Sequence, residues 1–370
     1  MMRRFCYLGF PLLLAMVLPT VAPAQSDTTE LPTTDIPPAR LDDPPPEAQP
    51  WAPFPTSLAG RGGYDDLRGL GSLGGLTQPG LFGSRVGYGV TWYPSQTVAG
   101  QPTNLGFVRQ ELSLSAPAWR DETDAVMWNA HVRANIYDTD AILADSGRAF
   151  PGSLWNVGLG GTYMHRFDNG WSAGGMVNVG SASDQPFNSF RDMTIGVGGF
   201  LRIPTSERSG WMLGAMWSAT GEVPFPIPIV SYSWQPSDQF GMNIGLPFSV
   251  RWRPIEDLLF DLSYTPIRNV HARASYRLAD GLGVYGGFDW SNEAYMLADR
   301  TDDRERLFYY EKTLSTGLRY DLGPTTAVDL SGGYAFDRFY FTGRQWSDQQ
   351  HDRIDVGNGL FMSLRLQLRY

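Results

Sequence analysis

Arginine is the residue type in this sequence whose spacing most clearly suggests a chemical role. The chain has 29 Lys and Arg residues together, and Lys312 is the one lysine. Many arginines occupy alternate positions in runs whose other positions are apolar. The polar positions carry Arg109, Arg133, Arg166, Arg202, Arg251, Arg273, Arg277, Arg319 and Arg365, together with Glu111, Asp261, Asp289, Glu311 and Asp329. The rigid guanidinium fork favours bidentate pairing with carboxylates. These arginines could therefore form salt bridges or, where unpaired, attract anions.

Signatures of catalysis and metal binding are absent from the sequence. The four histidines are His131, His165, His271 and His351, and no HExxH, CxxC or G-x-S-x-G spacing occurs. The residue two positions after His165 is Phe167, not the serine that a hydrolase would need on the same face. The loop acids Asp302, Asp303 and Asp348 lack the ligand spacing of a calcium loop. We predict no catalytic residue, no metal and no cofactor, hence a protein that is not an enzyme.

The arginines lie in long segments whose hydrophobicity alternates with period two. In the last segment, one face carries Leu360, Met362, Leu364, Leu366, Leu368 and Tyr370, and the other carries Ser363, Arg365, Gln367 and Arg369. Such runs are about 9–14 residues long, which exceeds the usual soluble strand of about five or six residues. A tilted strand needs roughly 9–11 residues to cross a bilayer.

Strands that cross lipid must close into a barrel, because the backbone finds no water there. Apolar side chains then face lipid and polar ones face a lumen, which gives the observed alternation. A soluble sandwich or solenoid would have shorter strands and a polar outward face. The pattern predicts an all-β fold, a transmembrane antiparallel up-and-down β-barrel over residues 83–370.

Turn signals and connection lengths indicate the number of strands. Long connections at 138–153, 181–190, 292–307 and 342–355 alternate with short ones at 168–170, 203–210, 252–257, 279–281 and 321–325. The segment 240–252 keeps one phase from Phe240 to Trp252, so it is interpreted as one strand and 227–235 as loop or a partial strand. This gives about 14 strands. Sixteen is the alternative, if 227–235 crosses and the chain turns at Leu246-Pro247.

Aromatic residues gather near the expected strand ends, among them Trp92-Tyr93, Tyr309-Tyr310 and Phe339-Tyr340-Phe341. Aromatic girdles at the two membrane interfaces would produce this distribution.

The N-terminal region reads as an export signal followed by a spacer. Arg3 and Arg4 precede an apolar stretch that ends at Ala22-Pro23-Ala24, which predicts a signal peptide over 1–24; a short membrane anchor is the alternative. Residues 25–57 are rich in proline and acids, and we expect them to be an extended linker. Residues 58–82 are rich in Gly and Leu and could be an entry or plug segment.

Composition narrows the class of protein further. The formal net charge is -9, which argues against a nucleic-acid partner, and the single cysteine, Cys6, excludes a disulfide scaffold.

Together, the signal peptide, the proline-rich spacer, the serial amphipathic strands and the last strand SLRLQLRY resemble a bacterial outer-membrane β-barrel protein, similar to uncharacterised barrel families of unknown function. The resemblance implies an outer-membrane location and lipid contact. It also implies that Leu364, Leu366, Leu368 and Tyr370 form the signal that the barrel-assembly machinery reads.

Two functions remain open from the sequence. The first is a passive channel for small solutes, with selectivity set by Arg109, Arg133, Arg251, Arg273, Arg277, Arg319, Arg365, Glu111, Asp261, Asp289, Glu311 and Asp329. The second is a closed structural or partner-binding barrel in which these groups pair. An outer-membrane hydrolase is a third possibility, for which the sequence offers no nucleophile and base. The sequence leaves the oligomeric state open.

Overall fold

The computed structural model describes residues 84–369, except 207, 219–224 and 266–268. The predicted signal peptide, linker and 58–82 segment lie outside the described residues. The described chain is almost entirely β-strand, and no helix in it is long and apolar enough to cross a membrane. The strands are β1 (Arg85–Thr97), β2 (Asn104–Arg120), β3 (Asp124–Thr139), β4 (Ser153–Arg166), β5 (Ser172–Ser183), β6 (Met193–Pro204), β7 (Gly210–Ser218), β8 (Ile227–Trp234), β9 (Phe240–Leu246), β10 (Phe248–Ile255), β11 (Leu258–Thr265), β12 (Asn269–Ala279), β13 (Leu282–Tyr295), β14 (Arg306–Asp321), β15 (Thr326–Gly343), β16 (Ile354–Val356) and β17 (Gly359–Arg369).

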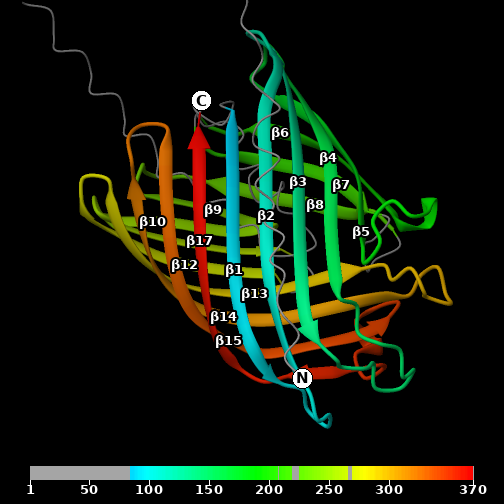
Figure 1. Cartoon of the computed structure of the whole chain (residues 1–370). Helices are drawn as coiled ribbons and strands as arrows, with labels where there is room; N and C mark the ends of the chain where they lie inside the picture. The colour runs from blue at the N-terminus through cyan, green and yellow to red at the C-terminus, as the bar shows by residue number, and fades with distance from the viewer. Residues whose placement is uncertain (1–83, 207, 219–224, 266–268, 370) are drawn as a thin grey trace, which may run out of the picture. The chain divides into compact units, whose positions relative to one another are not determined.

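The strands form one closed antiparallel sheet, in which each strand from β1 to β15 pairs with the next strand in sequence. Closure comes from β1, which pairs with β2 on one side and with the C-terminal β17 on the other, as Figure 1 shows. The three-residue β16 pairs with the end of β15 and forms a single bridge from Val356 to Val98 just after β1, while β17 takes the place beside β15 in the ring. Sixteen strands therefore close the barrel, and the predicted transmembrane up-and-down β-barrel is confirmed.

The preferred count of 14 strands is wrong, and the alternative of 16 is correct. Residues 227–234 form β8, and the predicted single strand over 240–252 is a hairpin of β9 and β10 that turns at Pro247. In this hairpin Ser249 pairs with Asn243, and Val250 with Met242. Partners in an antiparallel pair share a face, and each pair here has even–even or odd–odd numbering. The hairpin therefore keeps the same alternation as one long strand.

The two faces of the sheet differ as predicted. In β17, Leu360, Met362 and Leu364 are exposed, whereas the intervening Phe361 and Ser363 are buried. Trp92, Trp211 and Trp252 also lie on the exposed outer face. An apolar outer face and an inward polar face are what a lipid-embedded barrel requires.

The prediction that aromatic residues form girdles at the membrane interfaces is wrong for those at the loop ends of β14 and β15. Tyr309 and Tyr340 point inward and are fully buried, with their rings stacked at 4.4 Å between centroids. Phe308 and Phe341 are also fully buried, and Phe341 packs against Trp346 in the following loop. These strands extend beyond their predicted ends, so their aromatic residues build a core instead of an interfacial belt.

The strands have unequal lengths around the ring. β2, β3, β14 and β15 have 16–18 residues, whereas β7 to β11 have only 7–9. At the loop end, two strands from different parts of the ring meet: Ser183 at the end of β5 forms a bridge with Met296 just after β13, and the Met296 N–H donates to the Ala182 carbonyl at 2.7 Å. The barrel is thus crossed at its loop end between β5 and β13.

Candidate functional site

A buried ionic cluster fills the lumen at the loop end of the long strands. The Arg109 side chain in β2 is fully buried, with Nη2 2.8 Å from Glu293 Oε1 in β13 and Nη1 3.5 Å from Glu311 Oε1 in β14. Its Nε donates to Asn135 Oδ1 in β3 at 2.8 Å. Strands far apart around the ring thus meet at one guanidinium.

Tyrosines complete the contacts of this cluster. Tyr295 donates to Glu293 at 2.5 Å, and Tyr309 donates to Glu311 at 2.8 Å. Arg338 of β15 is also buried, and its guanidinium carbon lies 5.2 Å from the centre of the Tyr93 ring. An aromatic and aliphatic core surrounds these groups, with Leu105, Leu143, Leu154 and Phe361 among its most buried members. Buried charges need partners and hydrogen bonds of this kind, so the cluster braces the barrel and closes this part of the lumen.

Most of the other predicted lumen arginines are also paired. Arg133 Nε donates to Glu111 at 2.7 Å, and Arg251 Nε donates to Asp261 at 3.2 Å. Arg273 stacks on Tyr285, with its guanidinium carbon 3.5 Å from the ring centre.

The remaining contacts of the predicted lumen residues lie along β12 to β15 and at the turn end. Arg273 Nη2 lies 4.0 Å from Asp329, which also accepts a hydrogen bond from Tyr285 at 2.6 Å. His271 and Asp289 lie 2.7 Å apart. At the turn end, Arg277 pairs with Asp257, and Arg319 contacts Asp321 and Gln367.

Three of the predicted lumen arginines differ from this pattern. Arg365 of β17, Arg166 of β4 and Arg202 of β6 form no side-chain hydrogen bond or ion pair with the residues that the structure describes. Arg166 and Arg202 lie in one row of the sheet, because both are register partners of Ser172 in β5. Their guanidinium groups repel each other.

The wall that carries Arg166 and Arg202 has no acidic residue. The seven successive strands β4 to β10 contain neither Asp nor Glu within their bounds. The carboxylates that face the lumen come from β2, from β11 and from β13 to β15 instead. The lumen is thus electrostatically two-sided, with a salt-bridged side and a cationic side.

An apolar cluster lies beside the two arginines on the inner face of β4 to β8. Phe200, Met212, Met216 and Ile229 are buried against one another, and Met164, Met176 and Ile227 pack around them. We call these seven residues the lumen apolar patch. Apolar side chains on the inner face were not predicted, because the sequence analysis treated the whole inner face as polar.

The long loops are fastened to one another outside the lumen. Arg148 Nη2 lies 2.6 Å from Glu305 and 3.5 Å from Asp352, which joins three loops. Burial of Asp352 acts to raise the pKa of its carboxyl. Hydrogen bonds from the N–H groups of Asp145 and Ser146 and from the Thr342 hydroxyl outweigh this and lower that pKa below its usual value.

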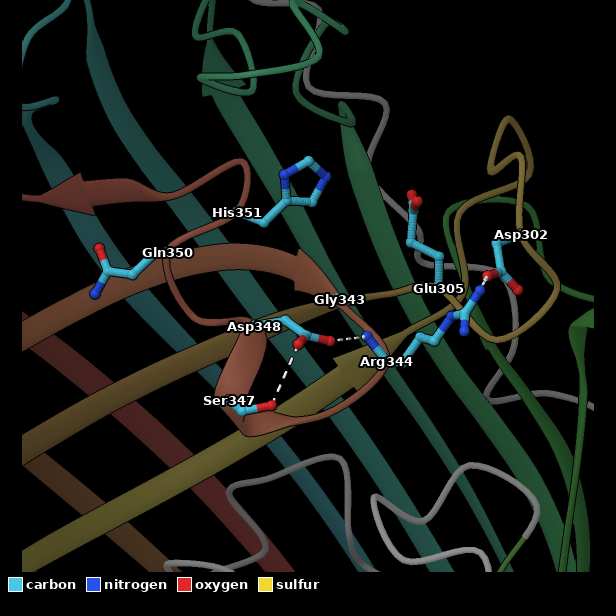
Figure 2. Close-up of a pocket in the computed structure, with 8 residues that line it drawn as sticks. All are labelled: Asp302, Glu305, Gly343, Arg344, Ser347, Asp348, Gln350 and His351. Atoms are coloured by element: carbon cyan, nitrogen blue, oxygen red, sulfur yellow. Dashed lines mark hydrogen bonds and ion pairs between the residues drawn. The ribbon is translucent and has the colours of Figure 1, made fainter.

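A pocket among these loops has a polar, charged lining. Figure 2 shows Asp302 bonded to the Arg344 side chain, and Asp348 accepting from the Arg344 N–H at 2.8 Å and the Ser347 hydroxyl at 3.2 Å. Among the described residues, no group of three or more His, Cys, Asp or Glu side chains is arranged to hold a metal ion. The pocket belongs to the loop surface and not to the lumen.

The sequence placed several of these residues on the correct face and missed others. Arg109, Glu111 and Glu311 were predicted in the lumen, and they lie in or beside the buried ionic cluster. Glu293 was missed because 292–307 was taken as a loop, and Arg338 was missed because the register shift opposite Tyr310 and Lys312 reverses the alternation of β15 there. The alternation continues through Glu293 and Tyr295, and it could have indicated the longer β13.

Of the predicted assembly signal, Leu364 and Leu366 are exposed on the outer face and Leu368 lies on the same face. Tyr370 lies outside the described residues.

Comparisons with known proteins give one matching protein family and several similar solved structures. A family model described as a domain of unknown function (DUF6268) matches residues 111–369. The chain is similar to the COG4313 outer membrane channel from Pseudomonas putida F1, with 10% identity, 80% of this chain and 100% of that chain covered, and a TM-score of 0.35. It is also similar to OccK7 (OpdD) from Pseudomonas aeruginosa, with 11% identity, 78% and 98% coverage and a TM-score of 0.35. For the TodX deltaS2S3 mutant monoaromatic hydrocarbon channel, the identity is 9%, the coverage 79% and 90%, and the TM-score 0.36. A search of curated proteins gives no match.

Proposed function

Because this chain belongs to the family described as a domain of unknown function (DUF6268), its activity has to be inferred from its own barrel, and we propose that it is a passive channel of the bacterial outer membrane for small anionic solutes. The path runs along the inner wall of β4 to β10. The observation that carries the proposal is the charge of that wall, which has arginines and no acidic residue. Rings of basic side chains favour anions in pores.

The size of the 16-stranded barrel is compatible with the passage of small solutes. Eight strands leave an interior that side chains can fill, whereas barrels of 16 strands are wide enough for an aqueous channel. The buried ionic cluster closes only the side formed by the long strands, where Arg109 meets Glu293 and Glu311. Solutes therefore pass beside this cluster, along the short strands.

The outer-membrane location is part of the same proposal. Exposed side chains such as Trp211, Leu213 and Trp252 suit contact with lipid. The predicted signal peptide at 1–24 would export the chain, and the last strand would present Leu364, Leu366 and Leu368 to the barrel-assembly machinery.

Planar-bilayer recordings test the channel. We expect conductance steps from the purified full chain and a reversal potential that indicates anion preference in a salt gradient. Arg166→Glu with Arg202→Glu should shift the preference toward cations. The control is Arg191→Glu with Arg304→Glu, which makes the same change of charge in the outer loops and should shift it much less.

A second candidate function is a closed structural or partner-binding barrel. It is favoured by the cross-lumen contacts of Arg109 and by the bridge between Ser183 and Met296. Folded protein that gives no conductance would support this candidate and refute the channel.

A further inference from the structure

We propose that the inner wall of β4 to β8 is a binding site for an amphipathic anion. Arg166 and Arg202 hold the anionic head, and the lumen apolar patch holds the apolar body. The inference deepens the proposed function, on which it rests, by naming the class of solute that the wall takes.

The strand register places head and body sites in consecutive rows of one face. The first row, at the turn end, runs through Arg166, Ser172, Arg202, Met212 and Ser231. The second runs through Met164, Gly174, Phe200, Gly214 and Ile229, and the third through Thr162, Met176, Gly198, Met216 and Ile227. Two apolar rows thus adjoin one cationic row, and the wall itself is amphipathic.

Glycines allow the large side chains to lie flat on this wall. A Cβ added at Gly174 would come 2.6 Å from Phe200 Cζ, so the phenyl ring covers the space beside that glycine. A Cβ at Gly198 would lie 3.3 Å from Met176 Cγ. Methionine side chains are flexible and polarizable and adapt to differently shaped apolar ligands. Of the seven residues, Met164, Met176 and Ile227 keep partial exposure, so they offer the accessible apolar surface over the buried Phe200, Met212, Met216 and Ile229.

The electrostatics of the wall select the sign of the head group. Arg166 and Arg202 have no ion-pair partner among the described residues and repel each other. Elsewhere in the lumen, Arg133 and Arg251 have carboxylates at hydrogen-bond distance. A bound carboxylate or sulfonate would supply the missing partner and relieve the repulsion, whereas a cation would add to it. Guanidinium groups bind such planar or tripodal oxyanions through charge-assisted hydrogen bonds.

The spacing of the rows sets the size of the ligand. The third row lies four residues along the strand from the first, which corresponds to about 13 Å. A fused aromatic ring system or a medium-length acyl chain attached to one anionic group fits this span. We take 2-naphthalenesulfonate as the probe, because it stays ionised at all working pH values and its ring system can cover the apolar rows.

Calorimetric titration of the full chain in lipid nanodiscs tests the site without requiring conduction. We expect 2-naphthalenesulfonate to bind and methanesulfonate, which has the head group alone, to bind at least about tenfold more weakly. Arg166→Gln with Arg202→Gln should weaken binding of the probe by about tenfold or more, because charge-assisted hydrogen bonds are lost. Met164→Gln with Met176→Gln, which changes the two partly exposed methionines of the patch, should reduce the difference between the two sulfonates.

A matched control removes two other arginines that make no ion pair with the described residues. Arg253→Gln with Arg365→Gln, in β10 and β17, makes the same change of charge away from the patch and should alter binding by less than about twofold. Unchanged affinity in Arg166→Gln with Arg202→Gln, or equal binding of both sulfonates, would overturn the proposal. Binding without conductance in planar bilayers would instead support the site and refute the channel.

Discussion

Replacing Arg109 by methionine should destabilise the barrel strongly, because it leaves buried acids without their partner. In the native protein the buried positive charges of Arg109 and Arg338 balance the negative charges of Glu293 and Glu311, and the Arg109 and Glu293 side chains are fully buried. Removing one partner of a buried ion pair costs about 3–5 kcal/mol. We expect this loss in the free energy of unfolding, measured by guanidinium titration in detergent micelles with tryptophan fluorescence.

A compensating variant tests whether charge, and not packing alone, causes the loss. Arg109→Met combined with Glu293→Gln restores the balance of buried charge, so most of the stability should return. Arg365→Met serves as the control, because Arg365 is only partly buried and forms no ion pair with the described residues; it should cost less than about 1 kcal/mol. The reasoning is refuted if Arg109→Met lies within about 1 kcal/mol of the native protein, or if Glu293→Gln makes it worse.

Three further predictions concern the loops, the wall and the lipid face. Because the pKa of Asp352 is lowered in the folded protein, its charged form stabilises the loops at pH values above the unfolded pKa of about 4. This contribution is lost as pH falls through the lower folded pKa. Hydrogen exchange should show loops 140–152 and 344–353 opening on acidification, and Asp352→Asn should open them already at pH 7. Gly180→Ala should lower the free energy of unfolding by about 1–3 kcal/mol, because the added Cβ would clash with the Val157 carbonyl oxygen. In Gly152→Ala the added Cβ meets no atom within 4 Å, so this variant should be tolerated. Equal unfolding midpoints of the two variants would contradict this. Leu330→Arg on the outer face of β15 should cost about 2–4 kcal/mol, and Leu322→Arg in the adjoining turn about 0–1 kcal/mol; similar losses of stability in vesicles would argue against lipid contact at Leu330.

Much of the fold follows from the sequence because alternation with period two is a direct consequence of having lipid on one side. The face of each strand, the antiparallel order and the closure by the last strand needed no further information. The number of strands did, because the β9–β10 hairpin turns about Leu246 and pairs residues of equal parity, such as Asn243 with Ser249. Alternation alone cannot distinguish that hairpin from one continuous strand. Only the pairing register resolves it.

The candidate site was less predictable, because it depends on contacts across the ring. The sequence places Arg109 and Arg166 on the same inward phase, yet one is enclosed by acids from β13 and β14 and the other faces a wall without acids. Which arginine meets which carboxylate is decided by strands about 200 residues apart in the chain, as the hydrogen-bond separation of Arg109 and Glu311 illustrates. No local pattern contains that information.

The unequal strand lengths also affect the surrounding membrane. At a tilt of about 40°, a strand of eight residues rises only about 20 Å, less than the apolar band of about 25 Å typical of such barrels. Strands β8 to β10, of 7–8 residues, therefore present a flank with negative hydrophobic mismatch, while β14 and β15 do not. Either the lipid beside this flank thins or the barrel tilts there, next to β8, which carries Ile227 and Ile229 of the lumen apolar patch.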